Sequence, residues 1–472
     1  MTRAHLAGYR RTTLVVGLAL LGVVWLSLPS PHSSRAKHED HSLFSRTPSF
    51  APEAEPERPA SSRDSTGLNI VPIARIPSGS LTVKEFFDRY GDQTVIVEGE
   101  AAHHPAFRLG FEGLRDLCPD AQVDTNVYNK DSDDWAGQSD NKQMALGTFV
   151  DEYIYNKNGT GELRYAGGGV GIPEVCPPLD YYTLVPKYAS CALIVVDVEH
   201  ETSEGERLHV QQAQPEMFLG SSGTKSEIHM DSLLTGFWMS VYIGEKTFRT
   251  ISFEDAVREL TVKSSDTGEE VPYFMEKDRY MKTLVNETSG EFEDVQLEIW
   301  DPDLELFPEL AKITIQEGTL GAGDWIYLPP ATLHGVSNSR ESWAVSVNSL
   351  YPAAIETFVE VCSQSNFALL CLEFAAEVGE CNLDLINTKE DLWNCLSESA
   401  FVQGVVSEFE SGRCEDKSLH EMSGFADYES WCQVICETLR NEPGDPEEGM
   451  EEYEERKERV NRICDLCSYR GL

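Results

Sequence analysis

The sequence has few basic residues for its length. Among its 472 residues, Lys and Arg number 38 against 80 Asp and Glu, which gives a formal net charge of −42. A protein that binds a polyanion needs a basic face, so this composition argues against nucleic acid as a partner. No internal repeat is visible, which argues against solenoids and propellers. With 41% hydrophobic residues, the chain is able to bury a sizeable core.

A charge-free apolar stretch is confined to residues 12–28, after three arginines in residues 1–11. Its length is near the minimum that spans a bilayer, and the basic flank fits a cytoplasmic tail. A cleaved signal peptide is the alternative, although residues 27–30 (Ser-Leu-Pro-Ser) form a poor cleavage site. We expect a type II signal-anchor membrane protein with its body lumenal or extracellular in the ER or Golgi, or a secreted protein if the segment is cleaved.

The cysteines are concentrated near the C-terminus, where nine of the 12 follow position 350. These nine are Cys362, Cys371, Cys381, Cys395, Cys414, Cys432, Cys436, Cys464 and Cys467. Such density after an apolar leader favours a disulfide framework. Zinc binding is the alternative for the two closest-spaced pairs, but no paired histidine follows them. Two sequons, at Asn158 and Asn286, lie in polar stretches and predict a glycoprotein.

Composition divides the rest of the chain into three parts. Residues 29–78 are rich in Pro, Ser, Arg and Glu and predict a flexible stem. Residues 79–352 begin with a Thr-capped amphipathic helix and continue as short β-branched runs between Gly and Pro, which indicates a sandwich or barrel. Residues 353–472 change to the apolar spacing of helices and predict an acidic, α-helical, disulfide-rich C-terminal domain.

Two histidines and one aspartate form a candidate metal site. His229 and Asp231 are spaced i, i+2, and His334 follows far downstream. Two imidazoles and one carboxylate on one face of an octahedron suit Fe(II) and leave room for a co-substrate and O₂. The alternative is a pair of structural histidines, because His-x-acid pairs arise by chance. Another such pair, His38 and Asp40, lies in the stem, where nothing can form a packed cavity.

Three further polar residues lie near strand-like runs in the same half of the body. Lys246 follows the apolar run 237–243, from which a lysine can reach into a barrel and pair with a carboxylate; an ordinary surface lysine is the alternative. Residues 343–348 alternate in polarity, so Ser346 and Asn348 share one face. They therefore point together into a pocket or together toward solvent.

Residues 79–352 resemble the JmjC (cupin-like) Fe(II)- and 2-oxoglutarate-dependent oxygenases. The segments that carry the resemblance are Ser222-Gly223-Thr224, His229-Met230-Asp231, Gly244-Glu245-Lys246, Gly323–Pro329 and His334. The gap between His229 and Lys246 is similar to that of the lysyl-hydroxylase and arginine-demethylase-like subgroup. The resemblance implies a mainly β fold with a double-stranded β-helix (jelly-roll or cupin) core.

The resemblance also implies roles for individual residues. The metal ligands would be His229, Asp231 and His334. The residues that bind the 2-oxoglutarate cofactor or line its site would be Lys246, Ser346, Asn348 and Ser226. Lys246, helped by Ser346, would neutralise the far carboxylate of 2-oxoglutarate. Catalysis would involve no residue beyond the metal centre, and O₂ would occupy the last metal position.

This chain departs from the subgroup at two places. Met239 stands where an asparagine usually helps to hold 2-oxoglutarate, and the tyrosine that often contacts this co-substrate has no evident counterpart. We expect a 2-oxoglutarate-dependent dioxygenase that hydroxylates a side chain of a protein or peptide in the secretory pathway. The alternatives are a catalytically impaired cupin-like binding or scaffold protein, and a cupin-type metalloenzyme that does not use 2-oxoglutarate.

Overall fold

The computed structural model describes most of the region between residues 62 and 416. The described ranges are 62–63, 67–129, 138–156, 162–167, 171–176, 186–189, 198–201, 207–210, 215–231, 234–264, 267–276, 280–285, 292–362 and 388–416, with isolated positions elsewhere. The sequons at Asn158 and Asn286 and most of the stem lie outside these residues, so glycosylation remains a prediction. The proposed domain boundaries likewise remain predictions.

The expected membrane anchor requires a correction. Within the ranges given above, no helix has both the length and the apolar character needed to span a bilayer. The apolar segment 12–28 itself lies outside those ranges. The type II assignment, with a lumenal or extracellular body, is therefore not supported.

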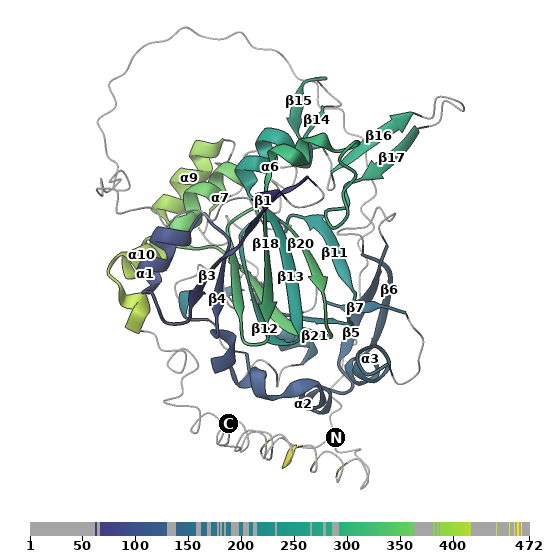
Figure 1. The fold of residues 1–472 in the computed structure, drawn as a ribbon. Coiled ribbons are helices and arrows are strands. Elements are labelled where there is room, and N and C mark those ends of the chain that lie inside the picture. The colour runs from purple at the N-terminus through teal and green to yellow at the C-terminus, as the bar shows by residue number, and fades with distance from the viewer. Residues whose placement is uncertain are drawn as a thin grey trace, which may run out of the picture. The chain divides into compact units, whose positions relative to one another are not determined.

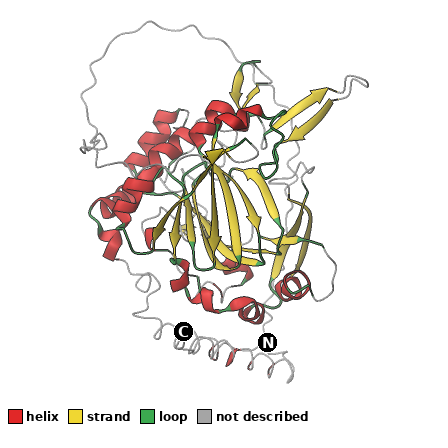
Figure 2. Cartoon of the chain, viewed as in Figure 1, coloured by secondary structure: helices red, strands yellow, loops and turns green. Residues whose placement is uncertain are grey.

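Two β-sheets form the centre of the protein, and helices lie around them (Figures 1 and 2). The first sheet has the order β1 (Ser62–Arg63), β2 (Asn69–Pro72), β18 (Thr314–Gly321), β13 (Glu245–Ile251), β20 (Leu333–Asn338) and β11 (Lys225–His229). The second has the order β3 (Ala74–Pro77), β4 (Val95–Glu98), β19 (Trp325–Leu328), β12 (Gly236–Ile243), β21 (Ser342–Ser349), β10 (Glu216–Gly220), β7 (Arg164–Ala166), β5 (Gln122–Tyr128) and β6 (Gln138–Ala145). This arrangement confirms the expected cupin-like β core.

Side-chain alternation along β12 explains how this strand serves two packing layers. Phe237, Met239 and Val241 belong to the apolar cluster between the two sheets, together with Phe248 of β13. Trp238 and Tyr242 point to the other face and belong to two other apolar clusters. Because both faces are covered, β12 is apolar along nearly its whole length, as expected for a central strand.

The helix predicted near residue 82 is present as α1 (Val83–Tyr90). Thr82 and Glu85 form a capping box, which satisfies backbone N–H groups at the helix start. Phe86 and Phe87 point inward and are buried. Gly91 is the C-cap of the helix.

The C-terminal helices share the core of the β body. These helices are α7 (Ile355–Cys362), α9 (Lys389–Glu398) and α10 (Ala400–Glu410). Figure 1 shows α10 beside α1, and the rings of Phe87 and Phe409 lie 5.9 Å apart. The remaining elements are α2 (Gly110–Leu117), α3 (Leu146–Phe149), α4 (Ile172–Val175), α6 (Phe253–Glu259), β8 (Val198–Glu201), β9 (Arg207–Val210), β14 (Thr261–Lys263), β15 (Glu270–Pro272), β16 (Met281–Val285) and β17 (Phe292–Gln296).

Disulfides are present both in the β body and in the C-terminal region. Cys118–Cys176 joins the ends of α2 and α4, and Cys381–Cys395 anchors α9. The other described cysteines, Cys362, Cys414 and Cys464, are also disulfide-bonded. These bonds agree with the expected disulfide framework, although the bridge inside the β body was not anticipated.

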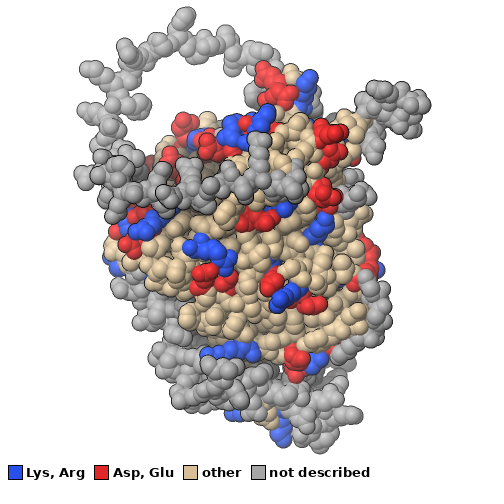
Figure 3. Space-filling view, in the orientation of Figure 1, with Lys and Arg blue, Asp and Glu red and all other residues tan. Residues whose placement is uncertain are grey.

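Charges of both signs are mixed on the surface shown in Figure 3. Arg75 pairs with Glu98 at 2.7 Å, and Arg249 pairs with Glu317 at the same distance. On this face, the excess of acidic residues is therefore not gathered into one continuous acidic patch.

Candidate metal centre

His229, Asp231 and His334 meet at one end of the space between the sheets. His229 is the last residue of β11 and lies directly opposite His334 of β20, with ring centroids 4.4 Å apart. Asp231 follows β11, and its Oδ1 lies 4.0 Å from Nε2 of His229 and 3.9 Å from Nε2 of His334. One ligand atom from each residue lies within 4.8 Å of the other two. The two histidines that the sequence separates thus face one carboxylate.

Backbone carbonyls fix the orientation of both imidazoles. Nδ1 of His229 lies 2.7 Å from the carbonyl oxygen of Glu227, and Nδ1 of His334 lies 3.1 Å from that of Thr332. A carbonyl only accepts hydrogen bonds, so Nδ1 carries the proton in each ring. Nε2 is then left with a lone pair that points toward Asp231, which is the tautomer a metal ligand needs. This donor set fits a divalent transition metal such as Fe(II).

The candidate ligands lie in an apolar environment. His229 and His334 are 5% and 3% exposed, and the ring of Phe237 stacks against His334 at 5.4 Å. The pKa of Asp231 is raised because burial disfavours the charged carboxylate, and the neighbouring His334 offsets only part of this effect. A buried carboxylate is costly without a positive partner, and a bound cation would offset that cost.

Lys246 of β13 is fully buried between the sheets. Its Nζ donates to Oδ1 of Asn338 at 3.0 Å and lies 5.3 Å from the ring centroid of Tyr165. In the pairing of β13 with β20, Lys246 lies opposite Asn338. Further along the same two strands, Thr250 lies opposite His334. The two pairs are four positions apart along each strand, roughly 13 Å. Burial lowers the pKa of Lys246 to about 7.

Ser346 and Asn348 lie on the inner face of β21. Ser346 is opposite Met239, and Asn348 is opposite Phe237, so both share the face of the cluster between the sheets. Oδ1 of Asn348 is buried and has no hydrogen-bond partner among the described residues. Ser346 and Asn348 therefore point together inward, which is the first of the two orientations considered from the sequence.

Ser226 has a different environment from the other candidate residues. It lies opposite Val336 in the pairing of β11 with β20, and its Oγ accepts a hydrogen bond from the backbone N–H of Val336 at 3.2 Å. This hydroxyl therefore participates in holding the two strands together.

The polar surroundings of Lys246 include two residues that the sequence analysis missed. Asn338 shares the inner face of β20 with His334 because the two are four positions apart in the strand, and that alternation was available from the sequence. Tyr165 is supplied by β7, which pairs with β10 at Gly220. No local pattern indicated this contact, which depends on pairing between distant strands. Tyr165 is a candidate for the tyrosine that could not be located from the sequence.

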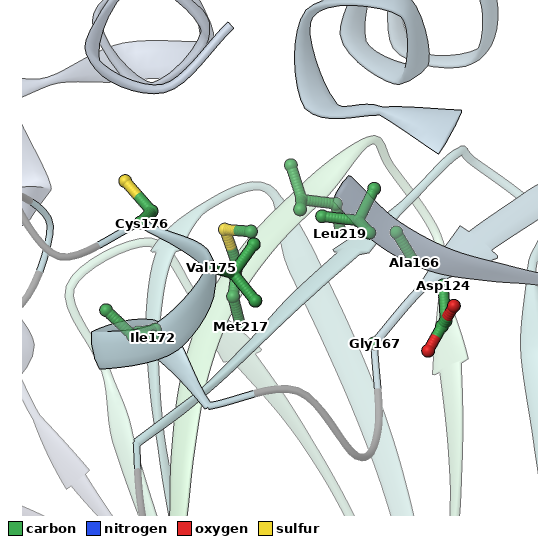
Figure 4. Close-up of a pocket in the computed structure, with 9 residues that line it drawn as sticks. Asp124, Ala166, Gly167, Ile172, Val175, Cys176, Met217 and Leu219 are labelled. Atoms are coloured by element: carbon green, nitrogen blue, oxygen red, sulfur yellow. The ribbon is translucent and has the colours of Figure 1, made fainter. Parts of the chain in front are cut away.

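An apolar pocket lies apart from the metal ligands (Figure 4). Its lining consists of Val123, Asp124, Ala166, Gly167, Ile172, Val175, Cys176, Met217 and Leu219. Met217 and Leu219 belong to the cluster on the outer face of the second sheet, together with the disulfide-bonded Cys176. The pocket contains none of the candidate metal or co-substrate residues.

Comparison with known proteins gives one positive result. A family model described as a cupin-like domain matches residues 82–357, which is more than half of the chain. The matched region includes the three candidate metal ligands and Lys246. No curated protein sequence matches the chain.

Proposed function

This chain belongs to the cupin-like domain family, and on that premise we propose that it is an Fe(II)- and 2-oxoglutarate-dependent dioxygenase. Its substrate would be a side chain of a protein or peptide, and the product a hydroxylated side chain. The observation that carries the proposal is the convergence of His229, Asp231 and His334 within 4.8 Å. Both imidazoles present Nε2 to the aspartate, as the ligands of a single ion must.

The three ligands would hold Fe(II) on one face and leave the opposite face open. When bound, iron together with 2-oxoglutarate and O₂ supplies the oxidising power that breaks a substrate C–H bond. His229 and His334 would keep their Nδ1 protons on backbone carbonyls throughout, so their ring orientation would not change during turnover. Asp231 would contribute the negative charge that keeps the cation in place.

Lys246 would bind the far carboxylate of 2-oxoglutarate. A pKa of about 7 means that the amine is only partly protonated near neutral pH when no anion is present. An adjacent carboxylate would raise this pKa and retain the proton on Nζ. Asn338 would help to orient Nζ through its 3.0 Å hydrogen bond. Ser346, on the facing sheet, would be a second donor to the co-substrate.

Aromatic and aliphatic side chains would exclude water from the reacting atoms. Phe237 stacks on His334 from the second sheet, and Phe248 lies 6.3 Å from the same ring on the first sheet. Met239 is buried beside them. Such a wall favours reaction with the substrate over side reactions with solvent.

A second candidate function is metal binding without 2-oxoglutarate, either as a metalloenzyme of another type or as a binding protein. Met239 favours this candidate because it faces Ser346 across the strand pair and donates no hydrogen bond. A co-substrate would therefore have fewer polar contacts at this position.

The test measures iron content and the conversion of 2-oxoglutarate to succinate by the purified full chain with added Fe(II). The informative variant is His229→Ala, and the matched control is His103→Ala, a histidine of the 3₁₀ turn Ala101–His103. We expect turnover in the wild type and in the control and none in His229→Ala. Equal turnover in His229→Ala would refute the proposal. Iron binding without succinate formation would favour the second candidate.

A further inference from the structure

Strand β11 contains an irregularity immediately before the metal ligand His229. Ser226 lies opposite Val336 and His229 lies opposite His334. Over this stretch β11 therefore contains one residue more than β20. Gly335 occupies the shorter side, where an added Cβ would lie 3.3 Å from the carbonyl oxygen of Ser226. This is a β-bulge, a feature that bends a strand and re-aims its side chains.

Glu227 lies inside the bulge, where the regular ladder does not hold the backbone. Its side chain is almost completely buried, with the whole residue 1% exposed. The hydroxyl of Tyr128, from β5, donates to Oε1 of Glu227. The backbone N–H of Ile299 donates to Oε2 at 2.8 Å. The carboxylate thus attaches the bulge to two segments that are distant in the sequence.

The carbonyl oxygen of the same residue accepts the Nδ1–H of His229 at 2.7 Å. The position of this carbonyl depends on how the bulge is held. We propose that Glu227, anchored by Tyr128 and by Ile299, is a positioning residue that sets the orientation of the His229 imidazole for metal binding. This inference rests on the proposed metal centre.

A purely structural role for the buried carboxylate is the competing explanation, and the chain contains a matched control for it. Tyr280 donates its hydroxyl to Oε1 of Glu309, which is also buried, and Lys282 lies 2.9 Å from Oε2. Around Glu227 the corresponding lysine is Lys225, at 4.0 Å. The Tyr280 pair therefore has the same chemistry, and the Glu309 carboxylate bonds Tyr280 and Lys282 rather than the strand that carries His229.

The experiment titrates Co(II), a spectroscopic substitute for Fe(II), into metal-free full chain and records its visible absorption. We expect Tyr128→Phe to weaken Co(II) binding by up to about 10-fold, the lower end of the effect of losing a direct partner of a ligand, because Tyr128 acts through Glu227. We expect Tyr280→Phe to bind Co(II) like the wild type, although it loses a similar hydrogen bond. Glu227→Gln keeps the side-chain volume but loses an acceptor, and should weaken Co(II) binding and change the absorption bands.

Wild-type Co(II) affinity and spectrum in both Tyr128→Phe and Glu227→Gln would overturn the inference. An equal loss of affinity in Tyr280→Phe would also overturn it, because the effect would then arise from general destabilisation. If Tyr128→Phe does not fold, Glu227→Gln carries the test. Absence of Co(II) binding by the wild type would instead refute the proposed metal centre itself, and the inference with it.

Discussion

Replacing Lys246 by methionine should remove a pH dependence of stability that the folded structure imposes. The amine is buried, and its pKa falls from 10.5 to about 7 because burial disfavours the charged form. Between these two values the unfolded chain binds more protons than the folded chain, so stability should rise with pH across this window. At about 1.4 kcal/mol for each pH unit, the whole window corresponds to roughly 5 kcal/mol.

The practical measurement covers part of that window. Between pH 7 and pH 9 this group should raise the free energy of unfolding by about 2–3 kcal/mol. Urea unfolding of the wild type and of Lys246→Met, followed by tryptophan fluorescence, gives this difference directly. The control is Lys84→Met, in which the lost lysine comes from the surface of α1 and pairs with Asp88. Its pH dependence should equal that of the wild type.

Adding 2-oxoglutarate provides a second arm of the same experiment. An anion beside Nζ would keep Lys246 protonated, so the wild-type rise in stability with pH should become smaller. Lys246→Met should also show a higher KM for 2-oxoglutarate with near-normal iron content, since it leaves the three metal ligands intact. Coincident pH profiles for the wild type and Lys246→Met would refute the reasoning about burial. An unchanged KM would remove Lys246 from the co-substrate site.

Two further predictions concern packing near the site and the covalent link in the β body. A Cβ at Gly220 would collide with Nδ2 of Asn338, so Gly220→Ala should destabilise the protein by about 1–3 kcal/mol and raise the KM for 2-oxoglutarate. Gly404→Ala in α10 has nothing within 4 Å and should lack both effects; equal behaviour of the two variants in thermal unfolding and kinetics would contradict this. Replacing Cys118 and Cys176 by serine should cost about 2–5 kcal/mol of stability, measured by urea unfolding, and an unchanged midpoint would show that the bridge contributes nothing.

Several features of this protein could be read from local sequence. The helix α1 follows from its Thr82 cap and the amphipathic residues after it, which act within one or two turns of the chain. Strand alternation places Ser346 and Asn348 on one face, whereas the pairing of β21 with β12 shows that this face lies between the two sheets. The expected membrane anchor shows the limit of local patterns, because the short apolar run at residues 12–28 fits a cleaved signal peptide as well as a membrane span.

The candidate metal ligands could be identified from the sequence because histidine and aspartate are residue types with specific metal-binding chemistry. His229 and Asp231 have a spacing that one strand end can satisfy, and His334 is the second imidazole that completes the ligand set. The sequence could not give their mutual distance, because the two imidazoles meet only when β11 pairs with β20. The burial of Lys246 depends on the packing of the two sheets against each other, and this burial lowers the pKa of Lys246.

Tertiary structure alone decided which distant residues surround the site. Tyr165 reaches Lys246 because β7 joins the sheet beside β10, and Glu227 is anchored from β5 and from the segment that contains Ile299. The partner of Cys118 likewise depends on where α4 packs. The sequence by itself determined which side chains carry chemistry and how neighbours alternate. Contacts between distant segments depend on the register and packing of whole sheets, which no local pattern of residues encodes.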